Sequence, residues 1–167
     1  MSFLKTFLWS LLVFMVSNLL LAIIIYASFG SFDTIIQIFT GNLTSLVYRL
    51  FCSMGHAIWL TIDLLAYHIT NDNIFFIFLS LILLIAPLIT AILARWFGEK
   101  RLHSFASLFL LSIISMTVSL ILMFNNVSYQ IIIGDVLIGS GALFNVVPGS
   151  LLNGIIYGII AFFVTKK

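Results

Sequence analysis

The chain has 167 residues, of which 63% are hydrophobic and only 7% are charged, and its mean hydropathy is +1.29. Soluble domains carry about 25% charged residues, so this composition excludes a soluble globular domain. It predicts an all-α, polytopic membrane protein made of a single transmembrane domain over residues 1–167. The formal net charge of +2 excludes the strongly basic surface with which proteins bind nucleic acids.

Apolar stretches long enough to cross a membrane fall at four places along the chain. A membrane-spanning helix needs about 20 apolar residues, and the sequence predicts such spans at residues 3–29, 73–94, 105–124 and 147–164. The first stretch is longer than the apolar core of a cleaved signal peptide, which has about 7–15 residues. We therefore expect it to be retained as a span.

The segment between the first two of these spans has room for two short spans, at 34–50 and 51–69, or for one. Basic residues accumulate in cytoplasmic loops, and two crossings would place every lysine and arginine on one side of the membrane. These residues are Lys5, Arg49, Arg95, Lys100, Arg101, Lys166 and Lys167. A single crossing would put the N-terminus outside, and only Lys5 would then lie on the side opposite to the other basic residues. The sequence therefore favours about six spans in the cell membrane, with both termini cytoplasmic, over five.

Three polar residues of this segment, Arg49, His56 and Asp63, are spaced seven apart. Neighbours in this series would be about 10.5 Å apart on one helix, which is too far for direct contact. We expect Arg49 to lie at the cytoplasmic turn, where its long side chain can reach water. Asp63 would lie within a span, where ionisable groups usually face protein. Asp63 is therefore the strongest candidate for a partner or ligand contact; the alternative is a wet position near the outer interface.

Histidine and cysteine side chains in the same segment raise the question of a metal or haem site. Cys52 and His56 are four residues apart and would share a face of one helix, but a third and a fourth ligand are not evident. We therefore interpret His56 as a packing or partner-contact residue. The scattered acids form no carboxylate pair, and the sequence predicts no cofactor, no metal, no catalytic residue and no enzymatic activity.

The last predicted span carries residues that favour helix packing. Proline suits the first turn of a helix, so we expect Pro148 to begin this span, with Asn153 about 7.5 Å further along. Small residues and asparagine favour helix contacts in membranes. We therefore expect Asn153, Gly154 and Gly158 to face protein, with Asn153 hydrogen-bonded to another span; the alternative is a helix that faces lipid.

Two short motifs resemble MreD, the rod-shape-determining membrane protein family. In GHAIWLTIDLL, residues 55–65, Trp59 stands where that family tends to have a second glycine, and the matching residues are Gly55, Leu60, Asp63, Leu64 and Leu65. In PGSLLNGIIYGIIAFFVTKK, the family's Pro-x-x-Leu-x-Asn pattern is matched by Pro148, Leu151 and Asn153. The resemblance implies a non-enzymatic scaffold of the cell-wall elongation machinery. Its implied partners are MreC-like proteins, an actin-like filament and wall-synthesising enzymes.

The layout also resembles the S-component of energy-coupling-factor vitamin transporters, which has six short spans. Those proteins dock to the other transporter subunits through Ala-x-x-x-Ala spacing in the first span, whereas here Ala22 and Ala27 are five residues apart. This alternative implies a small vitamin as ligand and transporter subunits as partners. It also implies a polar pocket open to the outside, for which the candidate residues are Tyr67, His68, Asn71, Tyr129, Gln130 and Asp135.

Overall fold

The computed structural model describes residues 3–41, 43–98, 100–124 and 140–166, and in these ranges its regular secondary structure is helical. The elements in chain order are α1 (Phe3–Ser28), α2 (Phe32–Thr40), α3 (Leu43–Phe51), the 3₁₀ helix η1 (Cys52–Gly55), α4 (Ile58–Thr70), α5 (Ile74–Phe97), α6 (Arg101–Phe124) and α8 (Ser140–Val164). The all-α class expected from the composition is therefore confirmed for the described residues.

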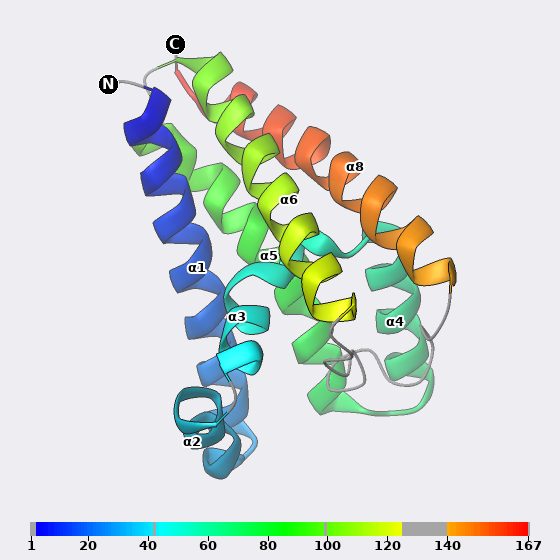
Figure 1. Cartoon of the computed structure of the whole chain (residues 1–167). Helices are drawn as coiled ribbons and strands as arrows, with labels where there is room; N and C mark the ends of the chain where they lie inside the picture. The colour runs from blue at the N-terminus through cyan, green and yellow to red at the C-terminus, as the bar shows by residue number, and fades with distance from the viewer. Residues whose placement is uncertain (1–2, 42, 99, 125–139, 167) are drawn as a thin grey trace.

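Four long apolar helices form the frame of the molecule. α1, α5, α6 and α8 each contain a stretch that is long and apolar enough to cross a membrane, which confirms that helices able to span a membrane form in the four clear apolar stretches. Figure 1 shows the two chain ends at the same end of this bundle. We refer to it as the terminal end and to the other as the far end.

Two left-handed turns connect helices at the far end. α1 closes with hydrogen bonds from Gly30 N to Ala27 O and from Ser31 N to Tyr26 O, and Gly30 has a φ of 71°. This is the pattern of a Schellman C-cap, in which the residue after the helix takes positive φ. Asp72, with a φ of 52°, closes α4 in the same way before α5 begins.

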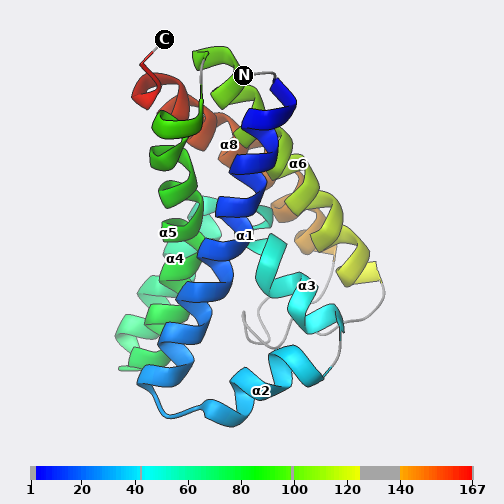
Figure 2. The same cartoon turned by 90° about the vertical axis from the view of Figure 1, so that its left-hand side faces the viewer.

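Residues 32–70 form short helices in place of the two predicted spans. α2 lies across the far end of the bundle, α3 rises from it into the bundle, and α4 returns to the far end (Figures 1 and 2). We call α3, η1 and α4 the re-entrant hairpin, and we call η1 with His56 and Ala57 its tip. The longest of these helices, α4, has 13 residues. It is about 20 Å long, against about 30 Å of membrane hydrocarbon.

The spans expected at 34–50 and 51–69 differ from the observed helices α2, α3 and α4; the number of membrane crossings stays a prediction. The helix is interrupted at the tip because Gly55 lies directly against α6. A Cβ atom built on Gly55 would lie 3.1 Å from Ser115 O and 3.1 Å from Ser119 Cβ. Beyond Gly55 the backbone of His56 is extended, and Ala57 precedes the first turn of α4. Close packing at this one point turns the chain back before it reaches the terminal end.

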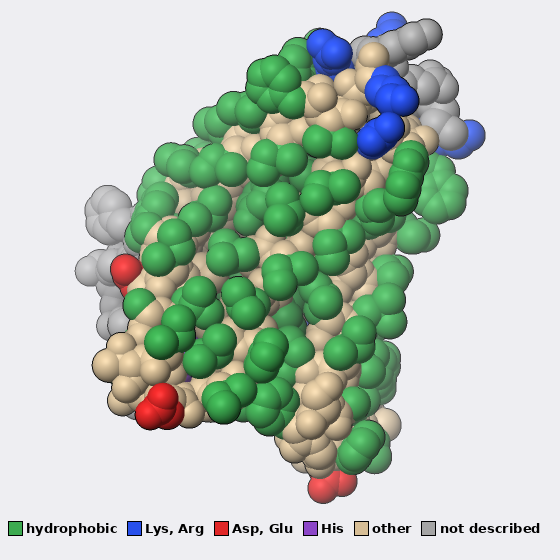
Figure 3. Space-filling view, turned by 180° about the vertical axis from the view of Figure 1, so that it is seen from behind, with side chains coloured by type: hydrophobic (Ala, Val, Ile, Leu, Met, Phe, Trp, Pro, Cys, Tyr) green, Lys and Arg blue, Asp and Glu red, His purple; other side chains and the backbone are tan. Residues whose placement is uncertain are grey.

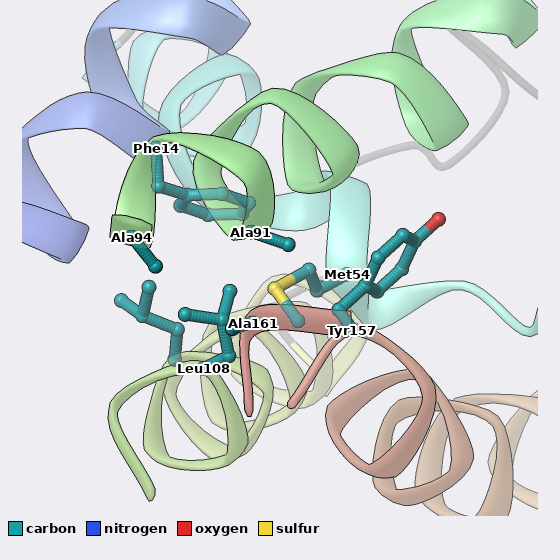
Figure 4. Close-up of a cluster of buried hydrophobic side chains, with 8 residues drawn as sticks. Phe14, Met54, Ala91, Ala94, Leu108, Tyr157 and Ala161 are labelled. Atoms are coloured by element: carbon teal, nitrogen blue, oxygen red, sulfur yellow. The ribbon is translucent and has the colours of Figure 1, made fainter. Parts of the chain in front are cut away.

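The tip contributes to the main hydrophobic core. Met54 is fully buried there and belongs to a cluster with residues from all four long helices, including Phe14, Leu108 and Tyr157. Figure 4 shows Met54 among these side chains. The hairpin is thus an interior element of the bundle, whereas large apolar side chains such as Leu12 and Ile159 lie exposed on the outside.

Charged side chains separate towards the ends of the bundle. Figure 3 shows lysine and arginine gathered at one end, and aspartates towards the other. At the terminal end, the Arg101 guanidinium donates to the Thr165 carbonyl at 3.1 Å and so ties α6 to the end of α8. Lys5, Arg95, Lys100 and Lys166 belong to neighbouring helix ends and turns at the same end.

Arg49 is an exception to the predicted grouping of basic residues. It lies in the last turn of α3, and its guanidinium donates to the hydroxyl of Tyr26, near the far end of α1. A turn after Arg49 was expected and is present at η1 (Cys52–Gly55), inside the bundle; the cytoplasmic position of this turn stays a prediction. Lys167 lies outside the described residues.

Pro148 lies inside α8, because this helix begins at Ser140. The expectation that proline would begin the last helix was therefore wrong. Membrane helices tolerate an internal proline where side chains and neighbouring helices compensate for the lost backbone hydrogen bond. Two residues after the proline, the Ser150 hydroxyl donates to the Val146 carbonyl, two residues before it, at 2.6 Å.

We predict that Gly149→Ala destabilises the protein by about 1–3 kcal/mol, the usual cost of overpacking. A Cβ atom at Gly149 would lie 2.7 Å from Ala57 Cα and 2.8 Å from Ala57 N, and this backbone cannot move without displacing the tip. Thermal unfolding of the purified protein in detergent should show a lower Tm. Leu152→Ala, at a position that is 45% exposed on the same helix, is the control and should have little effect. An unchanged Tm for Gly149→Ala would contradict this contact.

Candidate functional site

The tip of the re-entrant hairpin is held by an asparagine of α8. Asn153 is 2% exposed, and its Nδ2 donates to the Met54 carbonyl at 3.1 Å and to the His56 carbonyl. A backbone carbonyl in a 3₁₀ turn or an extended residue has no helical partner, and an unpaired one is costly away from water. Asn153 therefore supplies the hydrogen bonds that the broken helix cannot make.

The last carbonyls of α3 receive hydrogen bonds from two other long helices. The final four carbonyls of any helix lack partners within that helix. Asn18 of α1 donates to the Leu50 carbonyl at 3.3 Å, and Ser115 of α6 donates its hydroxyl to the Phe51 carbonyl. With Asn153, side chains from three long helices thus converge on the main chain of the hairpin.

His56 is a buried member of this network. It is 2% exposed, and its Nε2 lies 2.9 Å from the hydroxyl of Tyr48, which belongs to the opposite leg of the hairpin. The hydrogen bond links the end of α3 to the start of α4 across the tip. The structure thus places His56 in a hydrogen-bonded packing position.

Asp63 lies on the outer face of α4. Leu60, Thr61 and Leu64 of this helix are buried, whereas Asp63 is exposed. Exposed residues recur around it at helical spacing and form one continuous face, which we call the α4 face: Trp59, Ile62, Asp63, Ala66, Tyr67 and Thr70. Within the described part of the chain, no hydrogen bond or ion pair of Asp63 is found. The acid thus points away from the bundle, on a face that is otherwise mostly apolar.

Three of the six residues predicted to line an outer pocket lie in the described part of the chain. Tyr67 is exposed, the His68 ring stacks on Phe76 with 5.2 Å between ring centroids, and the Asn71 amide donates to the Tyr67 carbonyl at 2.8 Å. These side chains lie together at the far end of α4, where the Tyr67 and His68 rings contact each other with 5.3 Å between centroids. Tyr129, Gln130 and Asp135 lie outside the described residues.

Gly154 and Gly158 of α8 lie against α6. A Cβ atom on Gly154 would collide with the Ser112 hydroxyl, and one on Gly158 would lie 2.8 Å from the ring of Phe105. Glycine therefore allows α6 and α8 to approach closely, as small residues do at membrane helix interfaces. Both glycines face protein, on the same helix as Asn153.

Two residues of the network were missed by the sequence analysis. Asn18 is a single amide in the apolar stretch LVFMVSNLLLAIII, and this isolation was a readable signal, because a polar group at that depth needs a partner. Ser115 gave no comparable signal, since serine is frequent along α6. In the described part of the chain, no three histidine, cysteine or acidic residues lie together in a way that could hold a metal ion.

Comparison with known proteins finds no match to this chain among protein families, curated proteins or solved structures. Its fold and polar network define an all-helical protein with four helices that could span a membrane and a short helical hairpin held inside them.

We predict that Asn153→Leu destabilises the protein by about 1–3 kcal/mol, because it leaves two carbonyls of the tip without a donor. Hydrogen exchange measured by mass spectrometry should then become faster in residues 50–58, with a smaller change elsewhere. Asn71→Leu is the matched control, since this exposed amide bonds only to its own helix. Equal exchange at the tip in the wild type and Asn153→Leu would show that the amide does not hold the hairpin.

Proposed function

We propose that this chain is a multi-pass protein of the cell membrane, with four crossing helices, a re-entrant hairpin that does not cross, and both termini in the cytoplasm. The separation of charge supports this orientation, since lysine and arginine accumulate on the cytoplasmic side and gather at the terminal end (Figure 3). The hairpin's carbonyls bond to the surrounding helices, which is the condition under which irregular backbone is tolerated at membrane depth.

Within that membrane, we propose that the chain is a non-enzymatic scaffold subunit that binds another membrane protein through the α4 face. The observation that carries this proposal is the exposed Asp63. It lies about 10 Å from the far end of α4, with Trp59 and Tyr67 about one turn away on either side. Ionisable groups within membrane helices almost always face protein or a water-filled space. A helix of a partner that covers the α4 face would give the acid such surroundings.

The same proposal accommodates the resemblance to MreD. The two motifs that carry the resemblance meet in the structure, because Asn153 of the second bonds to the His56 carbonyl of the first, and Gly149 packs against Ala57. The first motif then continues into α4 and presents Asp63 outward. In this arrangement the second motif fixes the tip and the first presents the face that binds a partner, which would be an MreC-like protein.

The alternative of an S-component has less support. It rests on an outer pocket, three of whose residues lie outside the described part of the chain. Of the others, His68 stacks on Phe76 and the Asn71 amide donates to the Tyr67 carbonyl. At the tip, the Asn153 amide serves the hairpin's own main chain. The scaffold is therefore the function that the geometry supports better.

Topology can be tested by labelling single cysteines with a membrane-impermeant maleimide in a Cys52→Ser background. Asp33→Cys and Lys100→Cys should react from opposite sides of the membrane. Ser53→Cys should react from neither side until the protein is unfolded, because Ser53 is 4% exposed. Labelling of Ser53→Cys from the same side as Lys100→Cys would instead support six spans.

Partner binding can be tested with a photo-crosslinking amino acid at Ile62, next to Asp63 on the α4 face. In native membranes it should give adducts with a membrane protein, and Asp63→Asn should reduce their yield several-fold. Ile24 is the matched control: it is 57% exposed on α1, against 52% for Ile62, and should give lipid adducts. Lipid adducts alone at both positions would show that the α4 face lies in lipid, and the scaffold proposal would fail.

A further inference from the structure

A small cavity with polar and apolar walls lies between α1, the end of α3, the tip and α5. Its volume is about 20 Å³, and it is partly open. Asn18, Tyr48, Arg49 and Ser53 line one side, and apolar residues including Ala22 and Leu83 line the other. One water-sized group needs about 10–15 Å³ of such space, so the cavity has room for one small ligand or for one end of a larger one.

Arg49 brings a positive charge to this cavity. Its guanidinium donates to the Tyr26 hydroxyl and lies over the Tyr26 ring, 5.1 Å from the centroid. Both contacts are with a neutral side chain, whereas a guanidinium offers five N–H donors. In the described part of the chain, neither aspartate nor glutamate forms an ion pair with Arg49. A charge among membrane helices normally has a counter-charge. The Arg49 guanidinium has further N–H groups with which it can bind an anion.

The Ser53 hydroxyl is a second, independent indication of a ligand in this cavity. Its side chain is 4% exposed and lines the cavity, and its hydroxyl has no hydrogen-bond partner in the described part of the chain. Buried polar groups without a partner are rare because they lose their bonds to water and gain none. A hydroxyl can donate to an anion, as the guanidinium can. Asn18 is less suited, because its amide nitrogen already donates to two carbonyls.

We propose that this cavity is a binding site for a small anionic group, held by the Arg49 guanidinium and the Ser53 hydroxyl. The volume suits a halide ion or one terminal oxygen of an oxyanion. Such a group has two natural sources, a free ion such as chloride and the phosphate of an anionic lipid headgroup, and both offer the same recognition chemistry. Because Arg49 also bonds to Tyr26 of α1, the bound anion would hold α3 and the tip against α1.

The proposal can be tested by thermal unfolding of the purified full chain in a zwitterionic detergent. Sodium chloride, bromide and gluconate are compared at equal ionic strength, so that general screening of charge is the same. If the ligand is a free ion, Tm rises saturably with chloride and bromide and stays constant with gluconate, which is too large for the cavity. If it is a headgroup, Tm rises in gluconate with added phosphatidylglycerol but not with phosphatidylcholine.

Substitutions identify the site in either case. Arg49→Met should abolish the rise, and Ser53→Ala should weaken apparent binding about tenfold, as expected for a lost hydrogen bond to a charge. Arg95→Met is the control: it removes an exposed arginine from the end of α5 and should leave the rise unchanged. If Arg49→Met does not fold, the comparison of wild type with Ser53→Ala tests the site. A Tm independent of chloride, bromide and phosphatidylglycerol overturns the proposal, as does an identical dependence in wild type and Ser53→Ala.

Discussion

The fold depends on hydrogen bonds to a segment of main chain in which a helix ends inside the bundle. A helix that stops there exposes its last carbonyls where water is scarce, and each unpaired carbonyl would cost several kcal/mol in a hydrocarbon environment. Asn18, Ser115 and Asn153 remove this cost for the re-entrant hairpin, each from a different long helix. The hairpin and its frame are thus interdependent, since none of these amides and hydroxyls has an apolar substitute.

Close packing and hydrogen bonding act at the same places. Gly55 brings the tip against α6 and Gly149 brings α8 against Ala57, so the donors reach the carbonyls that they satisfy. In lipid, helix association depends on van der Waals contact and interhelical hydrogen bonds, because the surrounding tails are as apolar as the helices. Small residues at these two points therefore matter more than additional large apolar side chains would.

The four long helices could be predicted from the sequence because length and hydropathy alone determine them. The hairpin could not, because its two legs are apolar and their combined length suits two thin spans. The surroundings of Arg49 could not be predicted either: its charge favoured a position at cytoplasmic water, whereas in the structure the guanidinium contacts the hydroxyl and ring of Tyr26. The small-residue pattern around Asn153 predicted that this residue faces protein. Its acceptors at the tip could not be predicted, because hydrophobic periodicity does not reveal where the helix is interrupted.

The two legs of the hairpin present opposite charges in opposite directions. α3 turns Arg49 inward to the cavity beside α1, and α4 turns Asp63 outward to the α4 face. The legs are joined by the Tyr48–His56 hydrogen bond and by a tip that packs into the main core. A displacement of α3 relative to α1 would therefore be transmitted to α4 through a rigid connection. On this geometry, an anion that fixes α3 in place also fixes the orientation of the face through which the chain would bind its partner.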